Sequence, residues 1–490
     1  MPISGGTLIA LGLLLLHSSF LAAHTLPAPF FAELPAPVEG AMSASSIAET
    51  TDDPLWVRQF GSAGHDSAQS IAVDSGSVYI GGDVTETLPG QVSAGARDAF
   101  VRKYDLAGSE QWTRQFGTPQ DDAVSGVAVS TRGVYLAGYT AGALAGQSTA
   151  GGDDSFVRAY DTTGNELWTR QFGSDATDRA AQVASHDAAL YVVGDTYGAL
   201  PGQTKISQQG SSDAFVRKYD LAGNDLWTRQ FAISDTTWGS AIAVDETGVY
   251  VTGSWRQRGG ESHVFVRKYD LDGNLLWTSQ FGSDAQDLPA SIAVTEWGVA
   301  VVGNTFGTLP GQRSAGHVDA FVQGFDQAGN ELWTRQFGTD TSDSATAVVA
   351  DGPGIYVAGT TWGELLADRS YGASDLFVRG FDQAGNELWT RQWGSGAEDR
   401  THAIAANESG LYLAGLTGNI LPGQSSAGLS DAFAIKYDRR APSWRNQLRN
   451  GGFEAGKVKW HFYSDSQGYF TTAMPGFGSD TRATVNVTER

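Results

Sequence analysis

Short runs of alternating apolar and polar residues are the dominant pattern along this chain. Two such runs, Ser70 to Val73 and Val78 to Gly82, have the period of half-buried strands. They are followed by F-V-R-K-Y-D from Phe100 and by W-T-R-Q-F from Trp112, with glycine-containing turns between the runs. The pattern predicts an all-β unit of four strands.

The whole unit is repeated along the chain, mostly at intervals of 56 residues. Each strand of the W-T-R-Q-F type carries a Trp, at Trp56, Trp112, Trp168, Trp227, Trp277, Trp333 and Trp389. Each strand of the F-V-R-K-Y-D type carries a Phe, at Phe100, Phe156, Phe215, Phe265, Phe321, Phe377 and Phe433. Seven four-stranded units with glycine turns predict a seven-bladed β-propeller, whose radial repetition protects the sheet edges.

The two ends of the repeat are complementary. The series opens with a lone W strand, Leu55 to Phe60, and closes with a lone Phe433 to Asp438 that no W strand follows. Together they make one complete unit. We therefore expect residues 55–60 to form the outer strand of the last blade and to close the ring, which an open solenoid would not require.

A long motif resembles a known family, the bacterial SBBP β-propeller repeats. It runs from G-x-L-P-G-Q through D-A-F-V-R-K-Y-D-x-x-G-N-x-L-W-T-R-Q-F-G to V-Y-V-x-G, and the resemblance covers about residues 55–438. The resemblance implies an exported propeller scaffold without an assigned chemistry. It transfers a fold and no activity.

Composition and charge exclude several functions. With Lys+Arg 32 and Asp+Glu 54 the net charge is -22, which repels nucleic-acid phosphates and anionic lipids. With Cys 0 there is no disulfide, thiolate nucleophile or cysteine-ligated zinc. The remaining partner classes that we expect are a polysaccharide or a surface protein, bound by a monomeric propeller.

The N-terminal region has the composition of an export signal. Residues 1–23 hold no charged side chain and include an apolar stretch from Leu8 to Leu16, although a basic start is missing. Residues 24–53, rich in Ala, Pro, Ser and Thr, predict a flexible linker before the propeller of residues 54–438. The expected location is extracellular or at the cell surface, without membrane insertion after removal of the signal.

The last residues, 439–490, differ from the repeat. They hold 8 Lys+Arg against 4 Asp+Glu, and Asn446 to Glu454 with Trp460 to Tyr463 resembles the opening of jelly-roll carbohydrate-binding modules. Because such a sandwich needs about 8 strands, the segment is expected to be an incomplete carbohydrate-binding-like unit. Gly451 to Lys457 imitates a phosphate loop, but Val458 replaces the required Ser or Thr.

Two recurring features have structural interpretations. An Asp-x-x-Gly turn precedes the W strand at Asp105, Asp161, Asp220, Asp270, Asp326 and Asp382, where Asp accepts turn hydrogen bonds and Gly takes positive φ. A calcium loop of the form D-x-D-x-D-G-x5-E is absent there. Arg102 and Arg114 each fall between rings on one strand face, which predicts cation–π stacking between or behind blades.

Two further Asp series are expected on one rim of the disc, because the connections between blades and the loops between the second and third strands share a face. In the fourth unit Thr237 replaces the Asp of the first series and His263 replaces the Asp of the second, as if the two positions worked as a pair. Either they brace the loops through backbone hydrogen bonds, or paired carboxylates hold a cation such as calcium. The series are Asp66, Asp122, Asp178, Asp287, Asp343 and Asp399, and Asp98, Asp154, Asp213, Asp319, Asp375 and Asp431.

The fourth unit also has the most unusual loop. It lacks the L-P-G-Q sequence and carries Trp255, Arg256 and Arg258 instead, with Trp238 expected in the loop that leads into the fourth unit. The corresponding loops of neighbouring units carry aromatic residues. Aromatic rings there suit stacking on sugars, with Arg and Asp binding hydroxyls, while packing of the loops over the disc is the alternative. The candidate ligand-binding residues are Trp238, Trp255, Arg256, Arg258, Tyr197, Phe306 and Trp362.

No catalytic constellation is apparent. The eight His residues are scattered without H-E-x-x-H, and G-x-S-x-G does not occur. Quinone-cofactor dehydrogenases repeat a similar Asp-x-x-Gly-x-x-x-Trp element, but they resemble eight-bladed rings. The sequence therefore favours an exported, non-catalytic binding or scaffold module with no cofactor other than calcium; the alternatives are a propeller enzyme of the quinone-cofactor or glycan-active type and a purely structural spacer.

Overall fold

The computed structural model of the chain describes residues 53–366 and 370–440. The expected signal at 1–23, nearly all of the expected linker and nearly all of the C-terminal segment lie outside the described residues. Within the described part, no helix is long and apolar enough to cross a membrane.

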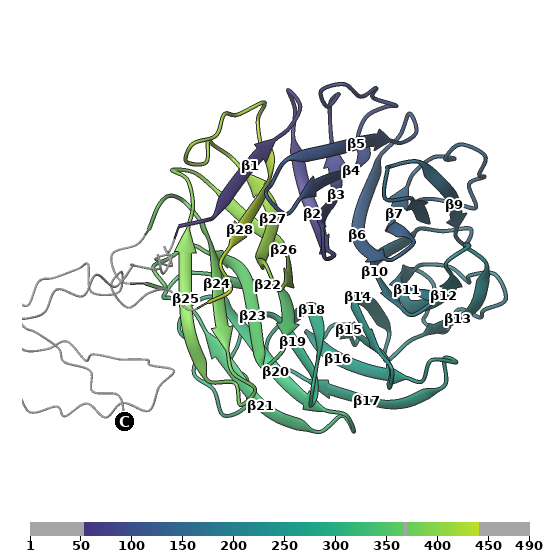
Figure 1. Cartoon of the computed structure of the whole chain (residues 1–490). Helices are drawn as coiled ribbons and strands as arrows, with labels where there is room; N and C mark the ends of the chain where they lie inside the picture. Colours follow the sequence, from purple (N-terminus) through teal and green to yellow (C-terminus); the bar gives the residue numbers. More distant parts are fainter. Residues whose placement is uncertain (1–52, 367–369, 441–490) are drawn as a thin grey trace, which may run out of the picture. The chain divides into compact units, whose positions relative to one another are not determined.

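The described residues form seven antiparallel sheets of four strands each, arranged as the blades of a propeller (Figure 1). The first three blades are β2 (Asp66–Val73), β3 (Ser77–Val84), β4 (Asp98–Asp105) and β5 (Glu110–Phe116); β6 (Asp122–Ser130), β7 (Gly133–Thr140), β8 (Asp154–Tyr160) and β9 (Glu166–Phe172); and β10 (Asp178–His186), β11 (Ala189–Thr196), β12 (Asp213–Asp220) and β13 (Asp225–Phe231).

The next three blades repeat this order. They are β14 (Thr236–Asp245), β15 (Gly248–Arg256), β16 (Ser262–Tyr269) and β17 (Leu275–Phe281); β18 (Asp287–Thr295), β19 (Gly298–Thr305), β20 (Asp319–Asp326) and β21 (Glu331–Phe337); and β22 (Asp343–Asp351), β23 (Gly354–Thr361), β24 (Asp375–Phe381) and β25 (Glu387–Trp393). The seventh contains β26 (Asp399–Asn407), β27 (Gly410–Thr417) and β28 (Asp431–Tyr437).

The seventh blade is completed by the first strand of the chain. Strand β1 (Trp56–Phe60) pairs antiparallel with β28, with Arg58 opposite Ala434 and Phe60 opposite Ala432. In Figure 1 the two strands lie side by side although they are the first and last in sequence. The expected all-β, seven-bladed propeller and its closure by residues 55–60 are thus confirmed.

The hydrophobic core lies between successive blades. At the junction of the seventh and first blades, Phe60, Phe100 and Tyr412 belong to one buried cluster. The rings of Phe60 and Phe100 meet edge to face at 5.7 Å, and the Arg102 guanidinium lies 4.1 Å from the Phe60 ring centre. Arg102 therefore stacks between blades, while Arg114 lies over the Trp112 ring of its own strand, 5.5 Å from the ring centre. Each blade buries its neighbour's aromatic residues.

A clasp joins the outer strand of one blade to the turn of the next. The Trp56 indole Nε1 donates to the Leu106 carbonyl at 3.2 Å, and Arg58 Nε donates to the Gly108 carbonyl at 2.6 Å. Gly108 has φ +82, and a Cβ there would lie 2.9 Å from the Trp56 ring. The same indole-to-turn bond recurs at Trp112, Trp168, Trp227, Trp277 and Trp333.

The Asp of each Asp-x-x-Gly turn shapes that turn. Asp105 Oδ1 accepts from the Ala107 and Ser109 backbone N–H groups at 3.0 and 2.8 Å. Asp270 makes the equivalent bonds to Asp272 and Asn274. This series therefore has the structural role that the sequence indicates.

Candidate ligand-binding face

One face of the propeller carries both the loops between second and third strands and the connections from blade to blade. The two kinds of segment touch where neighbouring blades meet, which we call a junction. For example, Arg97 in a loop of the first blade forms an isolated β-bridge with Asp121, which directly precedes β6. The Asp122 N–H donates to the Arg97 carbonyl at 2.8 Å. Each junction therefore forms a notch on this face, which we call the loop face.

Three of these notches are hollow, with cavities of about 550, 530 and 590 Å³. The first spans the first three blades, the second lies between the fifth and sixth blades, and the third between the third and fourth. All three belong to the loop face, so the repeat presents similar cavities around the ring.

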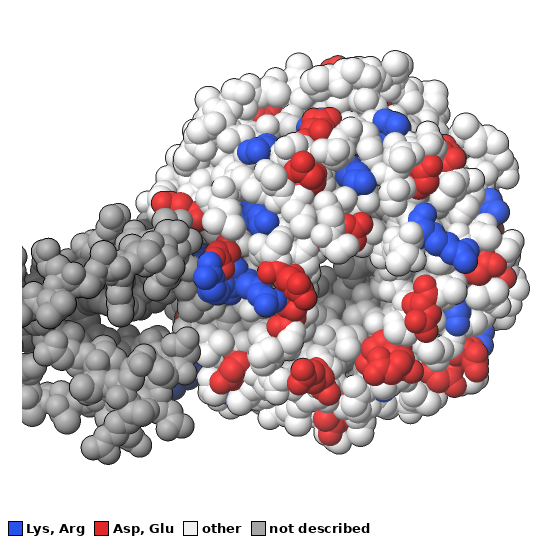
Figure 2. Space-filling view, viewed as in Figure 1, with Lys and Arg blue, Asp and Glu red and all other residues white. Residues whose placement is uncertain are grey.

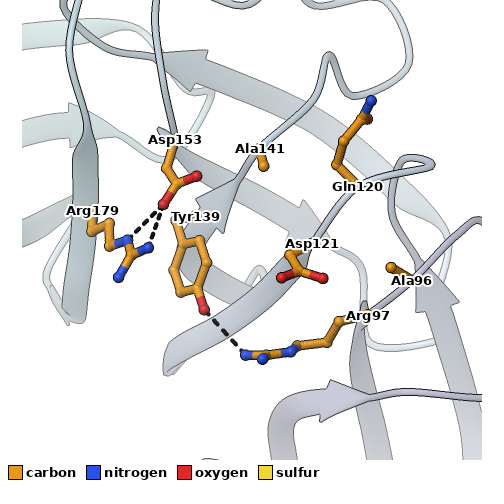
Figure 3. A pocket seen from close by; sticks show the side chains of 8 residues that line it. All are labelled: Ala96, Arg97, Gln120, Asp121, Tyr139, Ala141, Asp153 and Arg179. Atoms are coloured by element: carbon orange, nitrogen blue, oxygen red, sulfur yellow. Dashed lines mark hydrogen bonds and ion pairs between the residues drawn. The ribbon is translucent and has the colours of Figure 1, made fainter.

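The first cavity is polar and centres on Tyr139 of β7 (Figure 3). The Arg179 guanidinium lies over the Tyr139 ring, 4.6 Å from its centre, while Arg179 Nε donates to Asp153 Oδ2 at 2.8 Å. From the other side, Arg97 Nη1 donates to the Tyr139 hydroxyl at 3.4 Å. Two arginines from different blades thus converge on one aromatic ring, beside the carboxylates of Asp121 and Asp153.

Two half-buried acids lie next to this cavity on the second strands. Burial raises the pKa of Asp195 to about 7, although the nearby Arg179 guanidinium opposes the shift. Burial likewise raises the pKa of Asp83, against the influence of Arg97 3.8 Å away. The two arginines therefore face carboxyls that take up protons more readily than exposed ones.

Four of the sequence-predicted ligand residues occupy one equivalent position in successive blades. Arg256 ends β15, and Tyr197, Phe306 and Trp362 directly follow β11, β19 and β23. Phe306 and Trp362 are 48% and 40% exposed. We call Tyr197, Arg256, Phe306 and Trp362 the blade 3–6 arc; the equivalent residues of the other three blades, Thr85, Ala141 and Gly418, are small.

The second and third cavities flank members of this arc. Trp362 lines the second together with His317 and Asn304. Arg256 and Arg258 line the third with Glu261, and the Arg258 N–H donates to Asp235 Oδ2 at 2.8 Å. The arc thus combines exposed rings with charged hydrogen-bonding groups.

Trp255 and Trp238 are less exposed than a loop position would make them. Both lie in strands, Trp238 in β14 and Trp255 in β15, next to its last residue Arg256. The ring centres of Trp255 and His263 lie 5.2 Å apart, and Trp255 also packs against a buried hydrophobic cluster. The Arg256 guanidinium lies 5.4 Å from the centre of the Trp238 ring. The expectations that Trp255 belongs to the loop after the second strand and Trp238 to the loop before the first strand are therefore wrong.

Arg97, Tyr139, Asp153 and Arg179 do not stand out from the sequence, yet a signal was present. While the clasp residues are repeated from blade to blade, the Tyr139 position holds six different residue types in the seven blades. The equivalents of Tyr139 are Asp83, Asp195, Ser254, Asn304, Thr360 and Leu416.

The two Asp series meet at the same junctions. Asp98 Oδ1 and Asp122 Oδ2 lie 2.6 and 2.7 Å from the point that a Cβ on Gly117 would occupy. Each carboxylate also accepts a backbone N–H, Asp98 from Ala94 and Asp122 from Thr118. Such pairs lie at five junctions, around Gly61, Gly117, Gly173, Gly338 and Gly394.

The pairs join neighbouring blades rather than positions within one unit. Thr237 therefore belongs to the junction of Asp213, where its N–H donates to the Ser212 carbonyl. His263 belongs to the next junction, with Nδ1 3.4 Å from Asp287 Oδ2. The idea that Thr237 and His263 replace the two members of a single pair is thus corrected.

The electrostatic cost of pairing is visible at the ring closure. Burial raises the pKa of Asp66 to about 6, against hydrogen bonds from Ser62, and the Asp431 carboxylate adds to the rise. Burial raises the pKa of Asp122 in the same way, with Asp98 as its charged neighbour. Among the described residues no group of three or more His, Cys, Asp or Glu is placed to hold a metal ion.

Comparison with known proteins gives only distant similarities. No family model matches the chain. The regulatory protein FlaEY of Caulobacter vibrioides is 28% identical over 203 residues, which cover 37% of this chain and 21% of that protein. The chain thus matches about a fifth of this curated relative's length.

Solved structures similar to this chain include a WD40 domain and an endosialidase. The Pan2 WD40 domain of Neurospora crassa has a TM-score of 0.46 at 9% identity, covering 80% of this chain and 99% of that one. The phage phi92 endosialidase has a TM-score of 0.41 at 10% identity, covering 88% and 76%. The fold assignment rests on the strand pairing described above: the chain is an all-β repeat protein, a seven-bladed propeller of four-stranded blades.

Proposed function

We propose that the protein is an exported, non-catalytic binding module that binds a polysaccharide on its loop face. One observation carries this proposal: the framework of the blade is repeated nearly unchanged, while the residues that line the notches differ from blade to blade. A structural spacer has no physical need for such variation. A recognition surface does need such variation, because each position around an irregular ligand meets different groups.

The chemistry of the arc supports a carbohydrate. Exposed rings such as Phe306 and Trp362 offer flat apolar surfaces for sugar rings, and Arg256 and Arg258 offer donors for hydroxyl groups. Four successive blades carry these side chains, so an extended chain would touch several of them at once. Multiple weak contacts of this kind add up through effective concentration.

The charge pattern favours a neutral polysaccharide over a strongly anionic one. The net charge of -22 repels polyanions at long range. Figure 2 shows Lys and Arg beside Asp and Glu on the face in view, with uncharged residues over most of it. Mixed charges and neutral surface suit hydroxyl-rich ligands, whose hydrogen bonds need both donors and acceptors.

The test is binding of the full chain to a panel of insoluble and soluble polysaccharides, with the double variant Phe306→Ala, Trp362→Ala. Loss of two stacking contacts, each about 0.5–1.5 kcal/mol, is expected to weaken binding roughly 5- to 100-fold. The melting temperature should stay within 2–3 °C of wild type, roughly what a change of 1 kcal/mol produces in a domain of this size.

The matched control is Leu332→Ala. Leu332 is 48% exposed, like Phe306, but lies on the outer strand β21. It should leave binding unchanged. Equal binding by wild type and the double variant, or no binding to any polysaccharide, would refute the proposal and leave the spacer interpretation.

A further inference from the structure

Four of the five paired-carboxylate junctions contain buried polar atoms with no hydrogen-bond partner among the described residues. At these four an Oδ1 atom that points at the glycine makes no hydrogen bond within the described part of the chain: those of Asp98, Asp154, Asp319 and Asp375. These residues are 0–1% exposed. A buried, unpaired carboxylate oxygen is costly, so each of these atoms calls for a positively charged or donating partner.

The residue at the centre of each pair is restricted as well. At Gly173 an added Cβ would lie 2.2 Å from Asp154 Oδ1 and 2.9 Å from Asp178 Oδ2, so any side chain would displace the carboxylates. The chain departs from glycine at one junction, where Ala232 occupies this place. That is also the junction where Thr237 stands in place of the second Asp. All five two-carboxylate junctions therefore have glycine at this place, and glycine also stands at the junction of His263 and Asp287, as Gly282.

The two junctions with a single carboxylate provide their own partner. Lys205 Nζ lies 4.0 Å from Asp213 Oδ1, and His263 Nδ1 lies 3.4 Å from Asp287 Oδ2. At the five paired junctions none of the ion pairs found in the described residues reaches the carboxylates. Two buried negative charges there face each other without a counter-charge from the chain.

We propose that each of the five paired-carboxylate junctions binds an oxygen-preferring cation, with calcium as the best fit. Calcium accepts carboxylate oxygens together with backbone carbonyls and water in a flexible geometry, whereas magnesium demands a near-ideal octahedron. Each ion neutralises a pair that belongs to two blades. The cations therefore fasten neighbouring blades, including the ring closure, where Asp66 meets Asp431.

The experiment is calorimetric titration of the full chain with calcium chloride after exhaustive chelation, without polysaccharide. We expect up to five sites per chain and a rise in melting temperature on calcium addition, because ligands that bind only the native state stabilise it. The decisive variant replaces one carboxylate in every pair by Asn: Asp98→Asn, Asp154→Asn, Asp319→Asn, Asp375→Asn and Asp431→Asn. It should abolish both effects.

Two matched variants keep the result interpretable if the fivefold variant does not fold. Asp98→Asn alone retains an oxygen for the Ala94 N–H and should lower the stoichiometry by one site. Asp213→Asn alters a junction with a single carboxylate and should leave the stoichiometry unchanged. Absence of calcium and magnesium binding, or binding that survives in the fivefold variant, would overturn the proposal.

A melting temperature that neither calcium nor magnesium changes would also overturn it, because a cation that binds only the native state must stabilise that state. The polysaccharide assay is independent of this outcome. Failure of the cation proposal would leave the loop-face proposal standing, and the reverse is equally true.

Discussion

The clasp between blades predicts that two glycines with similar backbone angles differ greatly in their tolerance of alanine. Gly164 has φ +85 and lies in the turn held by Trp112 and Arg114; Gly202 has φ +74 and a Cβ there would meet nothing within 4 Å. Gly164→Ala and Gly202→Ala share the cost of a left-handed residue with a Cβ, about 1–2 kcal/mol. Any further loss of unfolding free energy in Gly164→Ala measures the contribution of the clasp to stability.

The additional destabilisation of Gly164→Ala follows from the contacts that the new Cβ would make. A Cβ on Gly164 would lie 2.9 Å from the Trp112 ring and 3.0 Å from Arg114 Nη2, so the ring must move. That movement breaks the bond from Trp112 Nε1 to the Thr162 carbonyl at 3.1 Å and weakens the one from Arg114 Nε to the Gly164 carbonyl at 2.8 Å. Loss of one neutral and one charge-assisted hydrogen bond costs about 2–4 kcal/mol.

The assay is urea unfolding followed by Trp fluorescence and by far-UV circular dichroism, with the same m value required for both variants. Gly202→Ala should lose about 1–2 kcal/mol of unfolding free energy, and Gly164→Ala about 3–6 kcal/mol in total. If the two variants are destabilised equally, the clasp contributes nothing beyond the strain of the turn, and the reasoning fails.

Three other outcomes are expected. Phe60→Ala, which removes a 9% exposed ring from the closing strand, should cost about 3–5 kcal/mol by urea unfolding; a loss below 1 kcal/mol would contradict the closure role of β1. The pKa of Asp195 is about 7 when folded and near 3.8 when unfolded, so the folded chain binds more protons between these values and wild type loses stability as pH rises from 4 to 7. Because Asp195 is partly exposed, we expect Asp195→Asn to gain only about 1–2 kcal/mol on wild type across this window; a constant difference from pH 4 to 8 in thermal unfolding would disprove the shift. Finally, a chain that lacks residues 55–60 should lose the cooperative unfolding transition, whereas unchanged cooperativity would show that the ring does not need its closing strand.

Much of the fold can be predicted from the amino-acid pattern alone, because the relevant signals are local and repeated seven times. The alternating runs set the strands, the Asp-x-x-Gly text sets the turns, and the split unit at Leu55 and Phe433 sets the closure. Even the stacking role of Arg102 and Arg114 followed from strand periodicity. These features depend on neighbours within a few residues or on one repeat of known length.

Only the tertiary structure decided which loop residues meet, because those contacts cross blade junctions. Arg97, Tyr139 and Arg179 are spaced about 40 residues apart, and blade packing brings them to one cavity. The same packing assigns Asp98 to Asp122 and separates Thr237 from His263, although the sequence grouped those two together. A repeat specifies what each blade contains; the register and angle between blades specify what each side chain faces.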